Sequence, residues 1–331
     1  MDTRPVAALA MARDLPTRLF DDDRRARLAE LVDLHDTVLT EFGSPDARAV
    51  LRDTEVLVTG WGAPPVDADA LAHAPRLRAV VHTAGTIKHL IHAECWERGI
   101  RVTTAANANG VPVAEYTLAM IMLAGKDAFA AARRYQHARG WDYSDAVGNY
   151  RRTVGVVGAS RVGRHLLRML QPFDFDVLLS DPYVDAGEAR RLGATRRDLD
   201  ETLAASSIVT LHAPSTPQTR HMIDKRRLAL LPDGATLINT ARGAVVDEDA
   251  LVTELTTGRI GAVLDVTDPE PAAPDSPLRT LPNVVLTPHI AGSLGNEVAR
   301  LGDAAIAEIG RYRAGESFAE EVDAARLNST A

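Results

Sequence analysis

The stretch that decides the fold is Val154-Gly-Val-Val-Gly158-Ala-Ser-Arg-Val-Gly163. It begins as a short apolar run, typical of a buried strand, and continues into a turn with a glycine at each end. A helical pattern follows over residues 164–170, and the next apolar run leads to Asp181. A strand, a glycine-containing turn and a helix, with an acidic residue about 20 positions further on, are the parts of a dinucleotide-binding site.

Each residue of this stretch has a physical role in such a site. Gly158 permits the tight turn, and Gly163 lets the helix pack closely on the strand. The first turn of the helix, with Arg161 and Val162, presents backbone N–H groups and the positive end of the helix dipole to a pyrophosphate. Asp181 would accept hydrogen bonds from the ribose hydroxyls, and its charge would repel a 2′-phosphate. The stretch therefore favours NAD over NADP.

Ser160 departs from the pattern, because a second glycine normally lets the backbone approach the pyrophosphate at this position. Two glycines alone would be explained as well by an ordinary turn, and the acidic residue after the next strand favours the cofactor site. We hypothesise that Ser160 tilts the diphosphate slightly or donates its hydroxyl to it, the alternative being that serine is merely tolerated there.

Similar apolar runs, bounded by turn residues and separated by helical patterns, recur on both sides of this stretch. After it they lie at residues 177–180, 208–211, 236–239, 261–264 and 284–286. Before it they lie at residues 6–11, around 37–39, and at 55–59, 77–82 and 101–103. Strands that alternate with helices indicate parallel sheets, and near-continuous apolar runs indicate strands buried on both faces. The sequence therefore predicts a doubly wound α/β fold.

Three segments complete the pattern. Residues 113–124 predict a helix that is apolar on nearly every face and too short to span a bilayer, so we expect it to be buried between layers or domains. Residues 133–150 are polar with little apolar period, which is typical of an irregular arm. Residues 296–312 predict one more amphipathic helix.

Composition limits the classes of function. The 331 residues, 46% hydrophobic and 25% charged, are typical of a globular protein of about two domains. A formal net charge of −8 argues against nucleic acid or an anionic membrane as partner, although a local arginine can still bind a small anion. Cys95 is the only cysteine, which excludes an intrachain disulfide.

The apolar run near the start of the chain is not a typical signal peptide. Asp2 precedes it and Arg13 ends it, whereas a signal peptide begins with a basic region. No later run reaches the roughly 18 apolar residues of a membrane helix. The sequence therefore predicts a soluble, cytoplasmic protein.

Four further motifs follow predicted strand ends in order. They are His212-Ala-Pro-Ser-Thr216 with Thr219, Asn239-Thr-Ala-Arg-Gly243, Asp265-Val-Thr-Asp-Pro-Glu270-Pro and Thr287-Pro-His-Ile-Ala-Gly292. With these motifs the chain resembles the D-isomer-specific 2-hydroxyacid dehydrogenases, from about Val56 to about Glu308. The resemblance implies two Rossmann-like domains with parallel sheets, in which an NAD-binding domain (residues 109–292) is inserted into a discontinuous, flavodoxin-like substrate domain (residues 1–108 and 293–331).

Three residues suit the chemistry of such an enzyme. Reduction of a 2-oxo acid requires a hydride donor, a cation for the carboxylate and a proton donor for the developing alkoxide. Arg242 suits the second task, because a guanidinium is always charged and binds a carboxylate bidentately. His289 suits the third, because imidazole exchanges protons near neutrality, and Glu270 would stabilise the imidazolium and fix its tautomer. The resemblance assigns the same roles to these residues.

The resemblance also implies binding residues. Ala84, Gly85 and Thr86 resemble the loop whose backbone N–H groups receive the substrate carboxylate, and Ile87-Lys88-His89 then depart from the family pattern. Cofactor contacts are implied for His212, Ala213, Pro214 and Thr219 at the adenine or ribose edge, for Thr240, Ala241 and Asp265 around the nicotinamide, and for His289 and Gly292.

Plainer interpretations exist for these residues. An arginine after a strand can pair with any surface carboxylate, Glu270 between two prolines can be a solvated loop residue, and the chain has nine other histidines. Three motifs in a fixed order behind a cofactor-type sheet favour catalysis instead. His89, His92 and Cys95, spaced by three on a predicted helix, could present ligands to zinc, but no fourth ligand is evident, so we expect no metal.

The sequence thus predicts an NAD-dependent oxidoreductase that transfers a hydride between NAD(H) and a small 2-oxo acid or D-2-hydroxy acid. Nothing in residues 83–110 selects one acid. The resemblance implies a homodimer, with the arm at residues 133–150 as the candidate contact. Two alternatives remain: an NAD(H)-sensing, corepressor-like binding protein on the same scaffold, and formate dehydrogenase-like hydride abstraction, which the glutamate at position 270 disfavours because that enzyme typically has glutamine there.

Overall fold

The computed structural model describes residues 4–137, 140–141 and 148–324. The chain forms two compact units, Met1–Gly110 with Ser293–Ala331, and Val111–Gly292. Each unit contains one sheet whose neighbouring strands are all parallel, with helices on both faces. The predicted α/β fold class is confirmed.

The first unit is built on a five-stranded sheet in the order β2-β1-β3-β4-β5, which is the flavodoxin-like order. Its strands are β1 (Val6–Ala10), β2 (Asp33–Leu39), β3 (Val56–Thr59), β4 (Ala79–His82) and β5 (Arg101–Thr104). Its helices are α1 (Leu15–Leu19), α2 (Asp22–Leu31), α3 (Pro45–Asp53), α4 (Ala68–His73), α5 (Ala93–Glu97), the 3-10 helix η3 (Gly295–Glu297) and α13 (Val298–Arg313).

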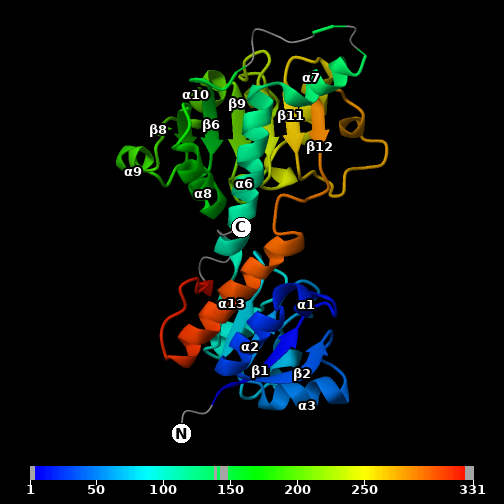
Figure 1. Cartoon of the computed structure of the whole chain (residues 1–331), viewed down its shortest axis with the longest axis vertical. Coiled ribbons are helices and arrows are strands. Elements are labelled where there is room, and N and C mark those ends of the chain that lie inside the picture. Colours follow the sequence, from blue (N-terminus) through cyan, green and yellow to red (C-terminus); the bar gives the residue numbers. More distant parts are fainter. Residues whose placement is uncertain (1–3, 138–139, 142–147, 325–331) are drawn as a thin grey trace. The chain divides into compact units, whose positions relative to one another are not determined.

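Alternate side chains of β1 supply two separate cores in this unit. Ala7 and Leu9 pack on the face covered by α1, α2 and α13, whereas Ala8 and Ala10 pack on the face covered by α3, α4 and α5. Helix α13, coloured orange, lies beside the blue α1 and α2 in Figure 1. The C-terminal helix therefore completes the core that the N-terminal strand begins.

The second unit is built on a seven-stranded sheet in the order β12-β11-β10-β9-β6-β7-β8, in which β6 lies between β7 and β9. Its strands are β6 (Thr153–Val157), β7 (Asp176–Ser180), β8 (Thr195–Arg196), β9 (Ile208–Leu211), β10 (Thr236–Asn239), β11 (Gly261–Leu264) and β12 (Val284–Leu286). This order places the first strand of the unit at the point where the winding reverses, as in a Rossmann sheet.

Helices cover both faces of this sheet (Figure 1). Val154 and Val156 of β6 pack against α6 (Ala106–Gly125), α8 (Arg161–Leu170) and α9 (Ala186–Arg191). Val157 packs with α10 (Leu199–Ala205), α11 (Lys225–Leu228) and α12 (Glu248–Thr256) on the other face. The unit also contains α7 (Ala128–Tyr135) and the 3-10 helices η1 (Gly243–Val245) and η2 (Pro277–Arg279).

Three predictions about single elements need correction. Helix α6 is buried along one side only, at Ala114, Thr117 and Ile121, because it covers one face of the sheet, and Leu123 is 38% exposed. The arm predicted at residues 133–150 begins inside α7, and its residues 138–139 and 142–147 lie outside the described part of the chain. The helix predicted through residues 89–95 starts only after His92.

No helix in the described part of the chain has both the length and the hydropathy that a membrane crossing requires.

Candidate functional site

The carboxyl ends of six strands lie in register across the second sheet. Their last residues pair in one row, in the order Ser180, Val157, Leu211, Asn239, Leu264 and Leu286. The residues that follow these strand ends are Asp181, Gly158, His212, Thr240, Asp265 and Thr287. Parallel strands lie about 4.8 Å apart, so motifs scattered over a hundred positions of sequence start along one edge of roughly 24 Å. Open α/β sheets bind their ligands at this edge.

The turn between β6 and α8 requires its two glycines. Gly158 has a φ of +99°, and a Cβ there would lie 2.7 Å from the backbone nitrogen of Ala213. A Cβ on Gly163 would overlap the carbonyl oxygen of Gly158. The turn is therefore closed against both the first turn of α8 and the loop after β9, and it has no room for a side chain at either glycine.

Ser160 is the N-cap of α8, and its Oγ accepts the Gly163 N–H at 3.4 Å. The serine side chain thus satisfies a backbone donor of the first helical turn, a role that we had not predicted for it. Arg161 and Val162 are the first two residues of α8, at the positive end of its dipole.

Asp181 is bonded to the same turn. Its Oδ2 accepts the Ala159 N–H at 2.7 Å, and its Oδ1 accepts the Tyr183 N–H at 2.8 Å. The carboxylate therefore lies beside the glycine-rich turn, where a ribose acceptor is expected.

The loop after β9 is stabilised by His212 at its start and by Thr219 within it. His212 is buried, its Nε2 lies 2.9 Å from Thr210 Oγ1, and burial lowers its pKa to about 3, so the ring is neutral at pH 7. Thr219 Oγ1 donates to the Pro214 carbonyl at 2.5 Å and accepts the Thr216 N–H at 2.9 Å. In this structure the Thr219 side chain closes its own loop.

The loop after β10 carries Arg242 and is organised by Asn239. The Asn239 side chain accepts the Ala241 N–H at 3.0 Å and donates to the Arg242 carbonyl at 2.9 Å. The Arg242 guanidinium donates to the Ala241 carbonyl at 2.6 Å. A Cβ on Gly243 would overlap the Thr267 carbonyl, so this loop packs backbone to backbone against the segment that leads to Glu270.

Glu270 and His289 are brought together from the loops after β11 and β12. His289 Nδ1 lies 2.5 Å from Glu270 Oε1, with the two side chains 51% and 39% exposed. An ionised carboxylate only accepts, so Nδ1 carries the hydrogen and Nε2 is the atom left to exchange a proton. The backbone of His289 is strained, with a φ of +53°.

Asp265 holds the His289 loop in this strained form. The residue is 2% exposed, and its carboxylate accepts hydrogen bonds from the Thr287 hydroxyl at 2.6 Å and from the Ile290 and Ala291 N–H groups at 2.8 and 2.9 Å. Its carbonyl accepts the His289 N–H at 3.0 Å. The prediction for Asp265 named only a nicotinamide contact, whereas the structure uses most of its acceptor capacity to position the loop that ends at Gly292.

The first unit carries Ala84, Gly85 and Thr86 after Thr83, the residue that follows β4. Ala84 is buried, and so is His82, the last residue of β4. His82 Nδ1 also lies 2.9 Å from Thr59 Oγ1, and burial lowers the pKa of this histidine to about 4. The histidine at the end of this apolar strand is the sequence signal by which the role of His82 could have been predicted.

His89, His92 and Cys95 lie in different environments. The two histidines are exposed, whereas Cys95 is buried with its Sγ donating to the Val66 carbonyl at 3.4 Å. Burial raises the pKa of this thiol to about 11, which disfavours the thiolate that a metal needs. Among the described residues, no three His, Cys, Asp or Glu side chains are gathered as metal ligands would be.

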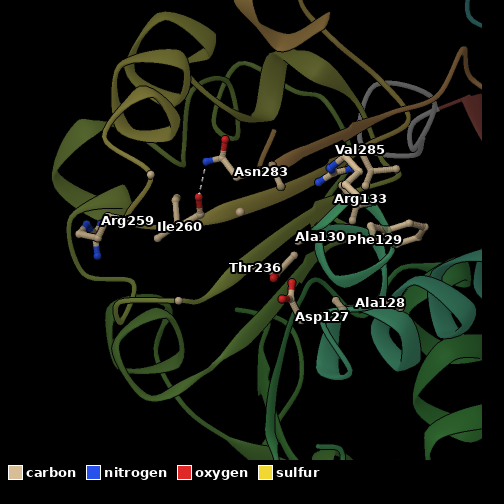
Figure 2. A pocket seen from close by; sticks show the side chains of 16 residues that line it. Asp127, Ala128, Phe129, Ala130, Arg133, Thr236, Arg259, Ile260, Asn283 and Val285 are labelled. Carbon is tan, nitrogen blue, oxygen red and sulfur yellow. Dashed lines mark hydrogen bonds between the residues drawn. The ribbon is translucent and has the colours of Figure 1, made fainter. Parts of the chain in front are cut away.

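A cavity of about 190 Å³ lies at the opposite edge of the second sheet (Figure 2). It is lined by Thr236 and Gly261, which begin β10 and β11, and by Phe129 and Arg133 of α7. Because the motifs follow the carboxyl ends of the strands, this cavity is separate from the candidate site.

Sequence reasoning missed two residues of α6 that contact the site loops. Tyr116 OH lies 2.8 Å from Thr287 Oγ1, and Thr117 Oγ1 lies 3.0 Å from Thr240 Oγ1. Both pairs join residues more than a hundred positions apart, and the only signal was the presence of two hydroxyl groups within the mostly apolar stretch at residues 113–124.

The strand order, the glycine-rich turn and the acidic residue after the next strand define a dinucleotide-binding α/β domain. Residues 118–291 match the family model of the D-isomer specific 2-hydroxyacid dehydrogenase NAD-binding domain. The chain belongs to the D-isomer-specific 2-hydroxyacid dehydrogenase family.

Three relatives illustrate this membership. D-3-phosphoglycerate dehydrogenase of Mycobacterium tuberculosis is 35% identical over 78% of this chain, and the chain spans only 49% of that enzyme's length. Glyoxylate reductase of Korarchaeum cryptofilum is 33% identical over 76% of this chain and 78% of its own. A D-isomer specific 2-hydroxyacid dehydrogenase from Xanthobacter autotrophicus, solved with NADPH and MES, has a TM-score of 0.75 at 26% identity, covering 98% of this chain and all of its own.

Proposed function

We propose that this chain is an NAD-dependent dehydrogenase that interconverts a small 2-oxo acid and the D-2-hydroxy acid. The observation that carries the proposal is the 2.5 Å contact of His289 Nδ1 with Glu270, on the same sheet edge as the glycine-rich turn. A proton donor with a fixed tautomer is what carbonyl reduction requires beside a cofactor site.

The residues at the edge suit a bound dinucleotide. The two glycines close the turn between β6 and α8, because neither Gly158 nor Gly163 has room for a side chain, and α8 directs its positive end toward a pyrophosphate bound there. Asp181 would bind the ribose, and its negative charge favours NAD over NADP. Asp265 keeps about one of four acceptor sites for a nicotinamide carboxamide. When bound, the reduced cofactor supplies the hydride to C2 of the 2-oxo acid.

The remaining chemistry belongs to the protein. Arg242 would bind the substrate carboxylate with its planar fork. His289 would give the proton on Nε2 to the carbonyl oxygen as the alkoxide develops, while Nδ1 keeps its hydrogen toward Glu270. Oxidation of the hydroxy acid returns the proton to Nε2. The family resemblance adds a carboxylate-binding role for residues 84–86 of the first unit.

The test is steady-state reduction of a panel of 2-oxo acids (glyoxylate, hydroxypyruvate and phenylpyruvate) with NADH. His289→Ala should lower turnover by about 10²–10⁴, while the NADH dissociation constant changes little. His92→Ala is the matched control, because His92 is exposed and makes no side-chain capping bond. Turnover within twofold of wild type in His289→Ala would refute the assignment, and tight NADH binding without turnover of any acid would favour a nucleotide sensor.

We also propose a homodimer. Its support is exposed apolar and aromatic surface within the second unit: Leu123 on α6, Tyr135 at the end of α7, and Trp141 and Tyr150 in the arm, the last three 58%, 87% and 78% exposed. Monomeric proteins rarely expose large contiguous apolar patches, and protein interfaces are enriched in aromatic side chains. Light scattering at micromolar concentration tests this, and a monomer mass would refute it.

A further inference from the structure

Two adjacent residues of α6 contact two different loops of the candidate site. Tyr116 reaches the loop that carries His289, and Thr117 reaches the loop that carries Arg242. These hydroxyls have no place in the chemistry described above. The directions of their hydrogen bonds show what each one does.

Tyr116 is a donor to Thr287. The Thr287 hydroxyl has a single hydrogen, and it goes to the Asp265 carboxylate, which can only accept. The 2.8 Å contact between Tyr116 and Thr287 must therefore use the tyrosine hydrogen. Burial raises the pKa of Tyr116, which keeps that hydrogen in place. The result is a directed chain from α6 through Thr287 to Asp265.

This chain ends on the backbone around His289. The two Asp265 carboxylate oxygens accept the N–H groups of Ile290 and Ala291, directly after the histidine, and the Asp265 carbonyl accepts the N–H of His289 itself. A residue with a φ of +53° persists only where its surroundings hold it. Through Thr287, Tyr116 supports the Asp265 carboxylate, which fixes the backbone next to His289.

Thr117, unlike Tyr116, is the acceptor in its hydrogen bond with the site loop. Its hydroxyl hydrogen goes to the Val113 carbonyl at 2.7 Å, within its own helix. The 3.0 Å contact with Thr240 must therefore use the Thr240 hydrogen, and both side chains are buried. Thr240 is two positions before Arg242, so this bond fixes the start of the loop that carries the arginine.

We propose that Tyr116 and Thr117 are positioning residues that hold the His289 and Arg242 loops in a single geometry from one helix. The inference rests on the proposed function, because it takes these two loops as the ones that carry the proton donor and the carboxylate anchor. Adjacent helical residues point about 100° apart, so one rigid element can hold two loops that leave different strands.

The test uses isosteric variants. Tyr116→Phe should lower kcat by roughly tenfold, because a proton donor displaced by a fraction of an ångström works less well. Thr117→Val should mainly raise the KM for the oxo acid, by roughly fivefold, because the carboxylate anchor is displaced. Thr117→Ser should restore the wild-type KM. NADH dissociation constants should change less than kcat and KM do, because the loops of Thr240 and Asp265 would contact only the nicotinamide, while the glycine-rich turn and Asp181 are untouched.

Two matched controls separate positioning from general loss of packing. Tyr312→Phe removes a half-buried phenol that donates to Glu55 at 2.6 Å in the first unit. Thr202→Val removes a buried helical hydroxyl that donates to the Asp198 carbonyl at 2.7 Å, as Thr117 does to Val113. Both controls should keep wild-type kcat and KM. Equal kinetic losses in the controls would overturn the inference.

A readout that does not need turnover keeps the inference separate from the proposed function. In Tyr116→Phe the backbone amides of Ile290 and Ala291 should exchange with deuterium about threefold faster or more, while amides of β6 are unchanged. If the wild type reduces no oxo acid, the proposed function is refuted. Faster exchange in Tyr116→Phe would then still show that Tyr116 positions the His289 loop. Unchanged exchange, or kcat and KM within twofold of wild type in both variants, would overturn the inference.

Discussion

At the scale of single residues, Asp181 combines two tasks. Its carboxylate accepts N–H groups from the glycine-rich turn and from Tyr183, so it stabilises the turn, and in the proposed function it is also the acceptor for a ribose. A hydrogen bond to a charged group contributes about 1.5–3 kcal/mol, which is large enough to measure in binding.

Asp181→Ser tests the coenzyme preference. The NADH dissociation constant should rise roughly tenfold and the NADPH constant should fall, because the repulsion of a 2′-phosphate is removed. Fluorescence titration with both coenzymes measures the ratio. Asp185→Ser is the matched control, since Asp185 caps α9 and serine is an equally good cap. An equal shift in both variants would attribute the preference to overall charge.

Ser160 gives a second residue-scale test, because its observed bond is to the helix. Ser160→Ala should lower the free energy of unfolding by about 1 kcal/mol, and Ser160→Gly by a few tenths, as at other N-caps. Urea unfolding measures both. The NADH dissociation constant should stay within twofold in each. Weaker NADH binding in the alanine variant without lost stability would show that the hydroxyl contacts the cofactor instead.

The sequence was sufficient to predict site residues that lie close together along the chain. It was not sufficient to predict residues whose role depends on a side chain far away in the sequence. Gly158, Gly163 and Asp181 were found because a strand, a turn and a helix fix their spacing. The bond between Tyr116 and Thr287 joins positions 171 apart, and no periodicity encodes it. The part played by Asp265 in holding the loop was missed for the same reason.

At the scale of elements, the apolar runs of the second sheet were placed well because strands buried on both faces have little freedom of register. Strands β9, β10, β11 and β12 have the predicted bounds. The two-residue β8 and five-residue α5 are too short to show a period. The error over α6 came from equating an apolar helix with a fully buried one, although only one side of it meets the sheet.

Helix α13 allows a test within one element, since two of its glycines differ only in their neighbours. A Cβ on Gly302 would overlap the Leu19 carbonyl, whereas on Gly310 it would meet only Leu31 Cδ1, at 3.9 Å. Gly310→Ala should therefore stabilise the protein by about 0.5–1 kcal/mol through helix propensity. Gly302→Ala should destabilise it by about 1–3 kcal/mol, as overpacking does. Thermal unfolding checks both, and equal effects would mean that α13 does not pack closely on α1.

At the scale of the whole molecule, the chain leaves the first unit after Gly110 and returns to it at Ser293, so both ends of the sequence serve one core. The net charge of −8 coexists with a candidate site for anions, because Arg242 and backbone amides act locally. Each unit also contains one buried neutral histidine at a strand end, His82 in the first and His212 in the second.

These two histidines predict a loss of stability in mild acid. Burial lowers the pKa of His82 to about 4 and that of His212 to about 3, against 6.5 for an unperturbed side chain. Between pH 6.5 and 4 the unfolded chain binds protons that the folded chain does not, so stability falls as pH falls. From pH 7.5 to pH 5 the loss should be about 2 kcal/mol for each histidine.

Urea unfolding at pH 7.5 and pH 5 measures this loss in wild type, His82→Gln and His212→Gln. Each variant should lose about 2 kcal/mol less than wild type over this interval, and His92→Ala, with an exposed histidine, should lose as much as wild type. If the two units unfold in separate transitions, His82→Gln should change the pH dependence of one transition and His212→Gln that of the other. The same pH dependence in wild type and both glutamine variants would show that other groups cause the acid sensitivity.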